Sequence, residues 1–153
     1  MPNTQTAIDT FVNVNMGSME RPEYLVRVAE DYFKRADGIF QDYTPSELLE
    51  LMDQAGIEKA VITVRGAEEN APGLAFPAAD PDRFVLSVSL DPRLGMKAVR
   101  QLSALCADHP VVLARVVPFF FNIAPNAREY YPIYAKCVEL DLPVSINTGI
   151  PGP

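Results

Sequence analysis

Five short stretches of apolar and β-branched residues recur along this chain, some with apolar and polar positions in alternation, and longer amphipathic stretches lie between them. Successive side chains of a strand point to opposite faces, so a period of two indicates a strand with one buried face. The first stretch covers residues 7–15, and one of its faces carries Ile8, Thr10, Val12 and Val14. We expect that face to pack against helices. The predicted strands cover residues 7–15, 60–64, 83–90, 111–117 and 143–148.

The intervening segments carry apolar residues at the spacing of an amphipathic helix. One predicted helix begins near Pro22 and ends at Gly38. The next begins with the capping-box sequence TPSE at residues 44–47, in which Thr44 caps the helix, and ends at Gly56. Further helices are expected over residues 71–79, interrupted at Pro77, and over residues 94–108 and 126–140.

Strands that alternate with helices predict a parallel sheet with right-handed crossovers. Two architectures compete, an open doubly wound sheet and part of an eight-stranded barrel. No glycine-rich phosphate loop follows a predicted strand, so a nucleotide site of the doubly wound type is unsupported. The polar positions favour the barrel, because within each strand they share one parity and gather towards its C-terminal end. These positions are Asp9, Asn13, Asn15, Thr63, Arg65, Ser87, Ser89, Asp91, Arg115, Ser145 and Asn147.

In a (β/α)8 barrel the inward faces converge on the axis, and the active site lies at the C-terminal mouth. We therefore predict an α/β fold comprising the first five strands of a TIM barrel, as one partial domain over residues 1–153. The alternative for each polar residue is a hydrogen-bonded group of the core or a cap at a strand end. Polar side chains in a strand buried on both faces either bond one another or line a wet cavity.

Composition narrows the classes of partner. The chain is 48% apolar and 22% charged, and its formal charge is −7 without a run of Lys or Arg. Nucleic acids and anionic membranes both require a basic surface, so neither is expected as a partner. The sequence has no stretch of about 20 apolar residues and no export signal at its N-terminus, which makes the cytoplasm the expected location. Cys106 and Cys137 are expected to be buried free thiols.

The sequence resembles the amidohydrolase-related family, the metal-dependent barrel hydrolases and decarboxylases of the amidohydrolase superfamily. The stretches that carry the resemblance are residues 8–13 (IDTFVN), 48–62 (LLELMDQAGIEKAVI), 82–84 (DRF) and 142–149 (LPVSINTG). The resemblance covers the whole chain but only about five of the family's eight strands. It implies hydrolysis or decarboxylation of a small carboxylate-bearing or cyclic substrate, and zinc as the family's divalent metal.

The family's metal ligands are replaced in this sequence. Its first strand usually reads Asp-x-His-x-His, and Phe11 and Asn13 occupy the two histidine positions; Asn147 occupies the position of a further histidine on the fifth strand. Zinc sites are built from imidazole, thiolate and carboxylate, so we expect no metal cofactor here. The only histidine, His109, is expected near a helix C-terminus, where a partial positive charge is favourable.

A metal-free site would use the remaining polar residues of the mouth, and the candidates are Asp9, Asn13, Asn15, Arg65, Asp91, Arg115 and Asn147. Either arginine is suited to hold a carboxylate, and Asp9 or Asp91 would act as acid or base if burial raised its pKa. Phe119, Phe120 and Phe121 would then wall an apolar pocket. The alternatives are that the arginines pair with the aspartates, that Asp91 begins a turn, and that the phenylalanines are core.

The C-terminal residues, 149–153, follow the last predicted strand without a closing helix. Five strands alone would leave two open sheet edges, so we expect the rest of a longer chain or a second copy to cover them. Two hypotheses follow. The first is the N-terminal portion of an amidohydrolase-related enzyme that acts on a small molecule. The second is a non-catalytic remnant, or a small-anion binding module, that oligomerises through its open edges.

Overall fold

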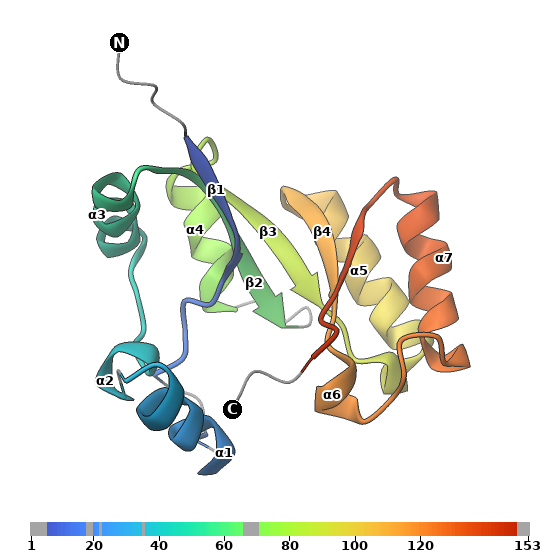
Figure 1. The fold of residues 1–153 in the computed structure, drawn as a ribbon. Helices are drawn as coiled ribbons and strands as arrows, with labels where there is room; N and C mark the ends of the chain where they lie inside the picture. Colours follow the sequence, from blue (N-terminus) through green and yellow to red (C-terminus); the bar gives the residue numbers. More distant parts are fainter. Residues whose placement is uncertain (1–5, 18–19, 22, 35, 66–70, 150–153) are drawn as a thin grey trace.

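The computed structural model describes residues 6–17, 20–21, 23–34, 36–65 and 71–149. Its centre is one sheet of five parallel strands in the order β1-β2-β3-β4-β5. The strands are β1 (Ala7–Val12), β2 (Ile57–Arg65), β3 (Phe84–Ser89), β4 (Val111–Val116) and β5 (Val144–Ile146). The sheet curls into half of a barrel, which confirms the predicted fold class (Figure 1).

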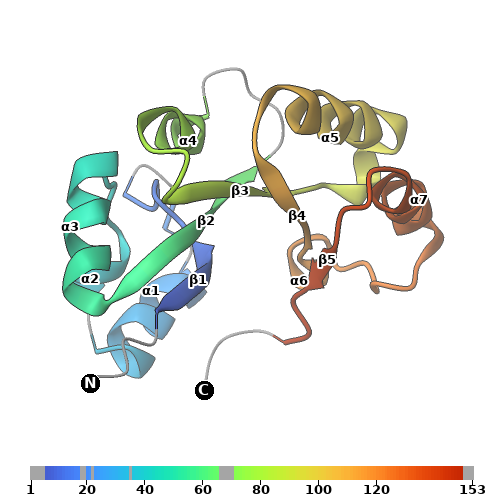
Figure 2. The same ribbon diagram turned by 90° about the horizontal axis from the view of Figure 1, so that it is seen from above.

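The principal helices cover the convex side of the curled sheet and leave its concave side open (Figure 2). They are α3 (Pro45–Ala55), α4 (Ala75–Ala79), α5 (Met96–Asp108) and α7 (Tyr131–Glu139). Near the C-terminal ends of the strands lie α1 (Glu23–Arg27), the π-helical turn η1 (Val28–Tyr32), α2 (Ala36–Ile39) and α6 (Pro118–Phe121). No helix in the described ranges is long and apolar enough to cross a membrane.

The hydrophobic core lies between the sheet and these helices. One parity of each central strand faces it, and each of these side chains is at most 2% exposed: Ala60, Ile62, Val64, Leu86, Val88, Ala114 and Val116. Facing them are Leu48 and Met52 of α3, Phe76 of α4, Leu102 of α5 and Ile133 of α7. Burying a side chain of this size stabilises the fold by about 1.5–3 kcal/mol. The opposite parity is thereby fixed on the concave side.

The capping box predicts the start of α3 correctly. Thr44 Oγ1 accepts from the Glu47 backbone N–H, and the Glu47 carboxylate accepts from the Thr44 backbone N–H at 2.8 Å. These hydrogen bonds also hold the pKa of Glu47 below its ordinary value. The helix ends where Gly56 adopts a left-handed φ of 69°, a conformation that costs glycine little. His109 caps the C-terminus of α5, as predicted.

The predicted helix between Pro22 and Gly38 is wrong, because three short elements occupy this segment. The chain continues from α1 into the π-helical turn and then breaks at Lys34, whose φ of 55° is incompatible with a right-handed helix. Gly38 lies inside α2 and does not end a helix. Pro22 lies outside the described residues.

The other helices begin differently from the prediction. Short 3₁₀ turns at Pro72–Leu74, Pro92–Leu94 and Arg128–Tyr130 precede α4, α5 and α7, so α5 and α7 start two and five residues later than expected. Pro77 does not interrupt α4, because it is the third residue of that helix. The first turn of a helix has no internal acceptor for its N–H groups, so proline costs little there.

The first strand is shorter than predicted, and its expected helix-facing parity is only partly correct. β1 ends at Val12, and Asn15 forms an isolated antiparallel bridge with Asp42. Val14 is 2% exposed, whereas Ile8 is 58% exposed. Register shifts interrupt the pairing of β1 with β2 at two points. Each such irregularity breaks the alternation of faces, which explains why the pattern of residues 7–15 did not predict burial.

Candidate functional site

Polar residues of one row meet at the C-terminal ends of four neighbouring strands. Arg65 of β2 pairs in register with Ser89 of β3, which pairs with Arg115 of β4, and Arg115 pairs with Ser145 of β5. All four have the parity opposite to the core-facing residues, so the row lies on the concave side of the sheet. This is the edge at which parallel barrels bind ligands. We call these four residues the polar row.

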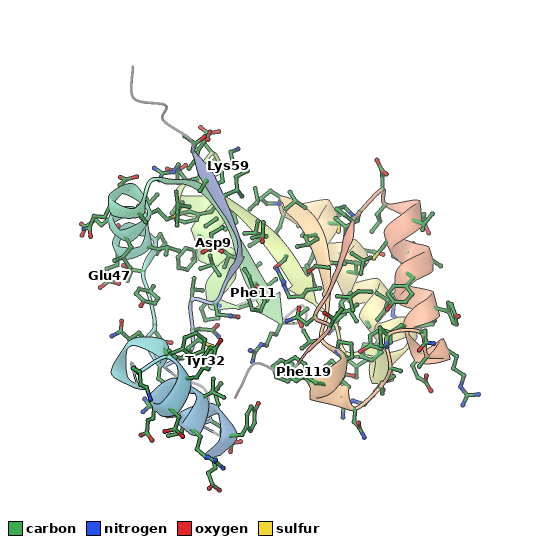
Figure 3. The ribbon with its side chains drawn as sticks, viewed as in Figure 1. Asp9, Phe11, Tyr32, Glu47, Lys59 and Phe119 are labelled. Atoms are coloured by element: carbon green, nitrogen blue, oxygen red, sulfur yellow. The ribbon has the colours of Figure 1, made fainter. Side chains whose placement is uncertain are left out.

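Arg115 reaches across the concave side from β4 to β1, although the two strands are not neighbours in the sheet. Its Nη2 donates to the Thr10 carbonyl oxygen at 2.6 Å, and its Nη1 donates to Ser145 Oγ at 3.4 Å. The guanidinium carbon lies 4.0 Å from the centroid of the Phe11 ring, a cation–π contact. Figure 3 shows Phe11 at the lower end of β1. Arg115 is therefore oriented by three groups from two strands.

The charge of Arg115 is buried, and no carboxylate among the described residues pairs with it. The residue is 4% exposed, and its contacts among the described residues are a carbonyl, a hydroxyl and an aromatic ring. Its Nε is buried and has no hydrogen-bond partner there. Burial lowers the pKa of Arg115, but an arginine stays protonated in proteins. Leaving a buried donor unsatisfied costs about 1–3 kcal/mol, so an acceptor placed at Nε would recover that cost.

One step deeper in the half-barrel, two hydroxyl groups satisfy each other. Ser87 Oγ donates to Thr63 Oγ1 at 3.2 Å, and the two residues are 0% and 6% exposed. Thr63 and Ser87 are register partners on the concave parity. Here the polar residues are hydrogen-bonded members of a packed layer, which was one of the two alternatives for strand positions. The open part of the concave side therefore begins at the polar row.

A second and a third arginine–phenylalanine contact lie beside the polar row. The Arg65 guanidinium lies 5.7 Å from the Phe120 ring, and that of Arg93 lies 4.9 Å from the Phe121 ring. Phe119 and Phe120 pack edge to face at 4.6 Å, and Figure 3 labels Phe119 on α6, the helix that follows β4. No residue of α6 is fully buried, and Phe120 is 47% exposed. The phenylalanines therefore lie at the surface beside the mouth, not in the core.

The two aspartates proposed as acid or base are both held by neighbours. Asp91 caps the 3₁₀ turn that follows β3, and its carboxylate accepts from the Arg93 guanidinium at 2.7 Å. These hydrogen bonds lower the pKa of Asp91, so the rise that a role as acid or base would require is not seen for this residue. Asp9 Oδ1 accepts from the backbone N–H of Phe11 at 3.0 Å, two residues along the same strand. Asp91 begins a turn, as one alternative had it, and its ion-pair partner is Arg93, which no alternative named.

The candidate asparagines lie at or beyond strand ends. Asn13 follows β1 directly and is half-buried, whereas Asn15 lies beyond the strand and forms an isolated bridge with Asp42. Asn147 follows β5, and its backbone N–H donates to the Val116 carbonyl oxygen at 3.0 Å. The sequence did not single out Arg93, whose partner Asp91 lies two residues earlier. From the sequence, Phe11 was interpreted only as the replacement of a metal ligand, and its contact with the Arg115 guanidinium was not predicted.

The donor groups of this site do not fit a divalent metal. No group of three His, Cys, Asp or Glu side chains lies close enough to hold a metal ion within the described part of the chain. At the positions that the resemblance assigns to ligands, Phe11 offers no donor, and Asn13 and Asn147 offer neutral amides. The Arg115 cation also lies against Phe11, where it would repel a second cation. The residues at these three positions therefore supply no imidazole and no carboxylate to a divalent metal.

Both thiols are unsuited to catalysis. Cys137 is buried and Cys106 is half-buried, and neither forms a disulfide. Burial raises the pKa of both, that of Cys137 to about 11. A thiol with a raised pKa is a poor nucleophile at neutral pH, so both residues act as packing groups between α5 and α7.

Several solved structures that this chain resembles in fold are decarboxylases. A 2,6-dihydroxybenzoate decarboxylase in complex with 2,6-dihydroxybenzoate matches 97% of this chain with a TM-score of 0.65 and 20% identity. The dihydroxybenzoic acid decarboxylase of a Polaromonas species, with bound manganese and the inhibitor 2-nitroresorcinol, matches 97% with a TM-score of 0.63 and 16% identity. The 5-carboxyvanillate decarboxylase of Sphingomonas paucimobilis matches 92% with a TM-score of 0.66 and 16% identity.

This chain spans about half the length of these proteins, because it covers 52%, 51% and 51% of their chains. Manganese, and not the zinc that the resemblance implied, is the metal bound in the Polaromonas enzyme. A comparison with curated proteins found no significant match. The amidohydrolase family model matches residues 19–153, which is most of the sequence. The chain belongs to the amidohydrolase family.

Proposed function

We propose that this chain contributes the ligand-binding mouth of a barrel that acts on a small carboxylated aromatic compound, with decarboxylation as the reaction. The remaining strands of that barrel come from further polypeptide or from another subunit. The family and the fold support this proposal, because the neighbours described above are decarboxylases of dihydroxybenzoate and carboxyvanillate.

The observation that carries the proposal is the repeated pairing of arginine with phenylalanine at the mouth. Arg115 lies over Phe11, Arg65 over Phe120 and Arg93 over Phe121. A guanidinium binds a carboxylate through parallel hydrogen bonds, and a phenylalanine ring packs against another aromatic ring. An aromatic acid carries both complementary groups in one small molecule.

Binding without turnover is the alternative, and one observation favours it. Decarboxylation of an aromatic acid needs a proton donor close to the ring carbon that loses carbon dioxide. The Asp91 carboxylate is held by Arg93 with a lowered pKa, and an Asp9 oxygen is occupied by the Phe11 backbone. A proton donor would therefore have to come from strands that complete the barrel.

The test is turnover by the purified full chain. It is incubated with 2,6-dihydroxybenzoate or 5-carboxyvanillate, with and without added Mn²⁺, and product formation is followed by chromatography together with carbon dioxide release. The proposal predicts loss of the carboxyl group from at least one of these acids. Binding of the acids without any product, by protein shown to be folded, would support the binding module instead.

A further inference from the structure

We propose that Arg115 supplies the positive charge of this ligand site in place of a divalent cation, and that its guanidinium binds the carboxylate of the ligand directly. The inference deepens the proposed function, on which it rests for the class of ligand. Its support comes from the burial, the partners and the position of one side chain.

The first step is the missing counter-charge. Charged side chains are almost never fully buried unless they are paired. Arg115 is 4% exposed, and no carboxylate contacts it in the described part of the chain. The other arginines at the mouth are more exposed, and Arg93 already has Asp91 as its partner. Within the described residues, the charge of Arg115 is therefore buried without a carboxylate partner.

The second step is the unused donors. A guanidinium carries five N–H groups in a planar fork. Acceptors in the described structure take one N–H of Nη2, through Thr10, and one of Nη1, through Ser145. Nε is buried and has no acceptor. A carboxylate that accepts from Nε and from a second N–H of the same fork would satisfy both the charge and the orphan donor.

The third step is position. The resemblance assigns Phe11 to the first ligand position of the family's metal, and the Arg115 guanidinium carbon lies 4.0 Å from the Phe11 ring centroid. The cation of Arg115 therefore lies beside the residue that occupies the position of a metal ligand in the resemblance. Phe11 is 46% exposed, so an aromatic ligand can reach part of its side chain. The same residue orients the cation and covers the ligand.

Titration calorimetry on the full chain tests this inference with benzoate as the probe and benzamide as its uncharged counterpart. In EDTA-treated buffer we expect benzoate to bind with 1:1 stoichiometry and benzamide at least tenfold more weakly. Added Mn²⁺ should leave the benzoate Kd unchanged within twofold. We expect Arg115→Met to abolish benzoate binding and Arg115→Lys to weaken it at least tenfold, because lysine keeps the charge and loses the fork.

Arg128→Met is the matched control, because its side chain is 92% exposed and lies outside the mouth; it should bind benzoate as the wild type does. Circular dichroism establishes that each variant is folded. Benzoate binding that requires Mn²⁺, or that survives Arg115→Met, would overturn the inference. If Arg115→Met does not fold, two measurements still test the inference: the benzoate affinity of Arg115→Lys, and the effect of Mn²⁺ on benzoate binding by the wild type. Benzoate binding without turnover of any aromatic acid would contradict only the proposed decarboxylation and would leave the role of Arg115 in ligand binding standing.

Discussion

Replacing Arg115 with methionine separates a ligand site from a structural link, because the two roles predict losses of stability of different size. As a link, Arg115 joins β4 to β1 through the Thr10 carbonyl and the Phe11 ring. As a ligand site, it holds a buried charge that is uncompensated until an anion binds. Methionine is flexible and apolar, so it fills much of the same space without the charge.

The magnitudes decide which effect prevails. The variant loses a charge-assisted hydrogen bond worth about 1.5–3 kcal/mol and a desolvated cation–π contact worth about 2 kcal/mol. It also removes the desolvation penalty of an ion that is 4% exposed, which is several kcal/mol. These contributions nearly cancel, so we expect the free energy of unfolding of Arg115→Met to lie within about 1 kcal/mol of the wild type. If no desolvation penalty were recovered, the lost hydrogen bond and cation–π contact alone would cost about 3.5–5 kcal/mol.

Urea unfolding followed by circular dichroism measures this difference, in buffer with the lowest practical anion concentration. The slope of free energy against urea must agree between the two proteins for the comparison to hold. At a benzoate concentration of about 100 times Kd, the wild type should gain about 2.7 kcal/mol and the variant nothing. A loss above 3 kcal/mol without benzoate, or an equal gain of both proteins with it, would refute the reasoning.

The remaining predictions concern the scaffold. Ser87→Ala should lower the free energy of unfolding by about 1–3 kcal/mol, because the Thr63 hydroxyl loses its hydrogen-bond partner. The double variant Ser87→Ala/Thr63→Val should recover part of that loss, and urea unfolding of the wild type, both single variants and the double variant measures it. Gly73→Ala should destabilise by about 1–3 kcal/mol, because a Cβ there would lie 2.7 Å from a β2 side-chain carbon. Thr44→Ala should lower the free energy of unfolding by about 1 kcal/mol, because α3 loses its N-cap; thermal unfolding should show this as a lower Tm. The pKa of Cys137 rises to about 11 on folding, so above about pH 9 the unfolded chain binds fewer protons than the folded one. Stability should therefore fall from pH 9 to 11 in the wild type and less in Cys137→Ala, relative to each protein at pH 7.

Much of the fold follows from local patterns in the sequence. The apolar, β-branched stretches predict β2 and β3, because those two strands pair in regular register and pack one face against the core. The residues at 44–47 predict the start of α3, because the capping box is satisfied by groups within four residues. The shared parity of Arg65, Ser89 and Arg115 likewise predicts the polar row, since register partners of a parallel sheet lie on the same face.

The features that the sequence did not predict depend on contacts distant in the chain or on single backbone angles. The bulged pairing of β1 with β2 leaves Ile8 exposed. The left-handed φ of Lys34 breaks a segment whose apolar spacing is that of one helix. The contact between Phe11 and Arg115 joins residues more than a hundred positions apart. A role of Asp91 as acid or base required burial to raise its pKa, but a hydrogen bond from Arg93, two residues away, lowers that pKa.

Nuclear magnetic resonance of the arginine Nε–H groups tests the central claim most directly, because a buried Nε–H exchanges slowly enough to be observed. The Arg115 signal is assigned by its loss in Arg115→Lys. In EDTA-treated buffer, we predict that benzoate shifts this signal progressively to a saturating value and that benzamide leaves it in place. An Arg115 signal that stays fixed while benzoate binds elsewhere, or that responds only after Mn²⁺ is added, would contradict the account.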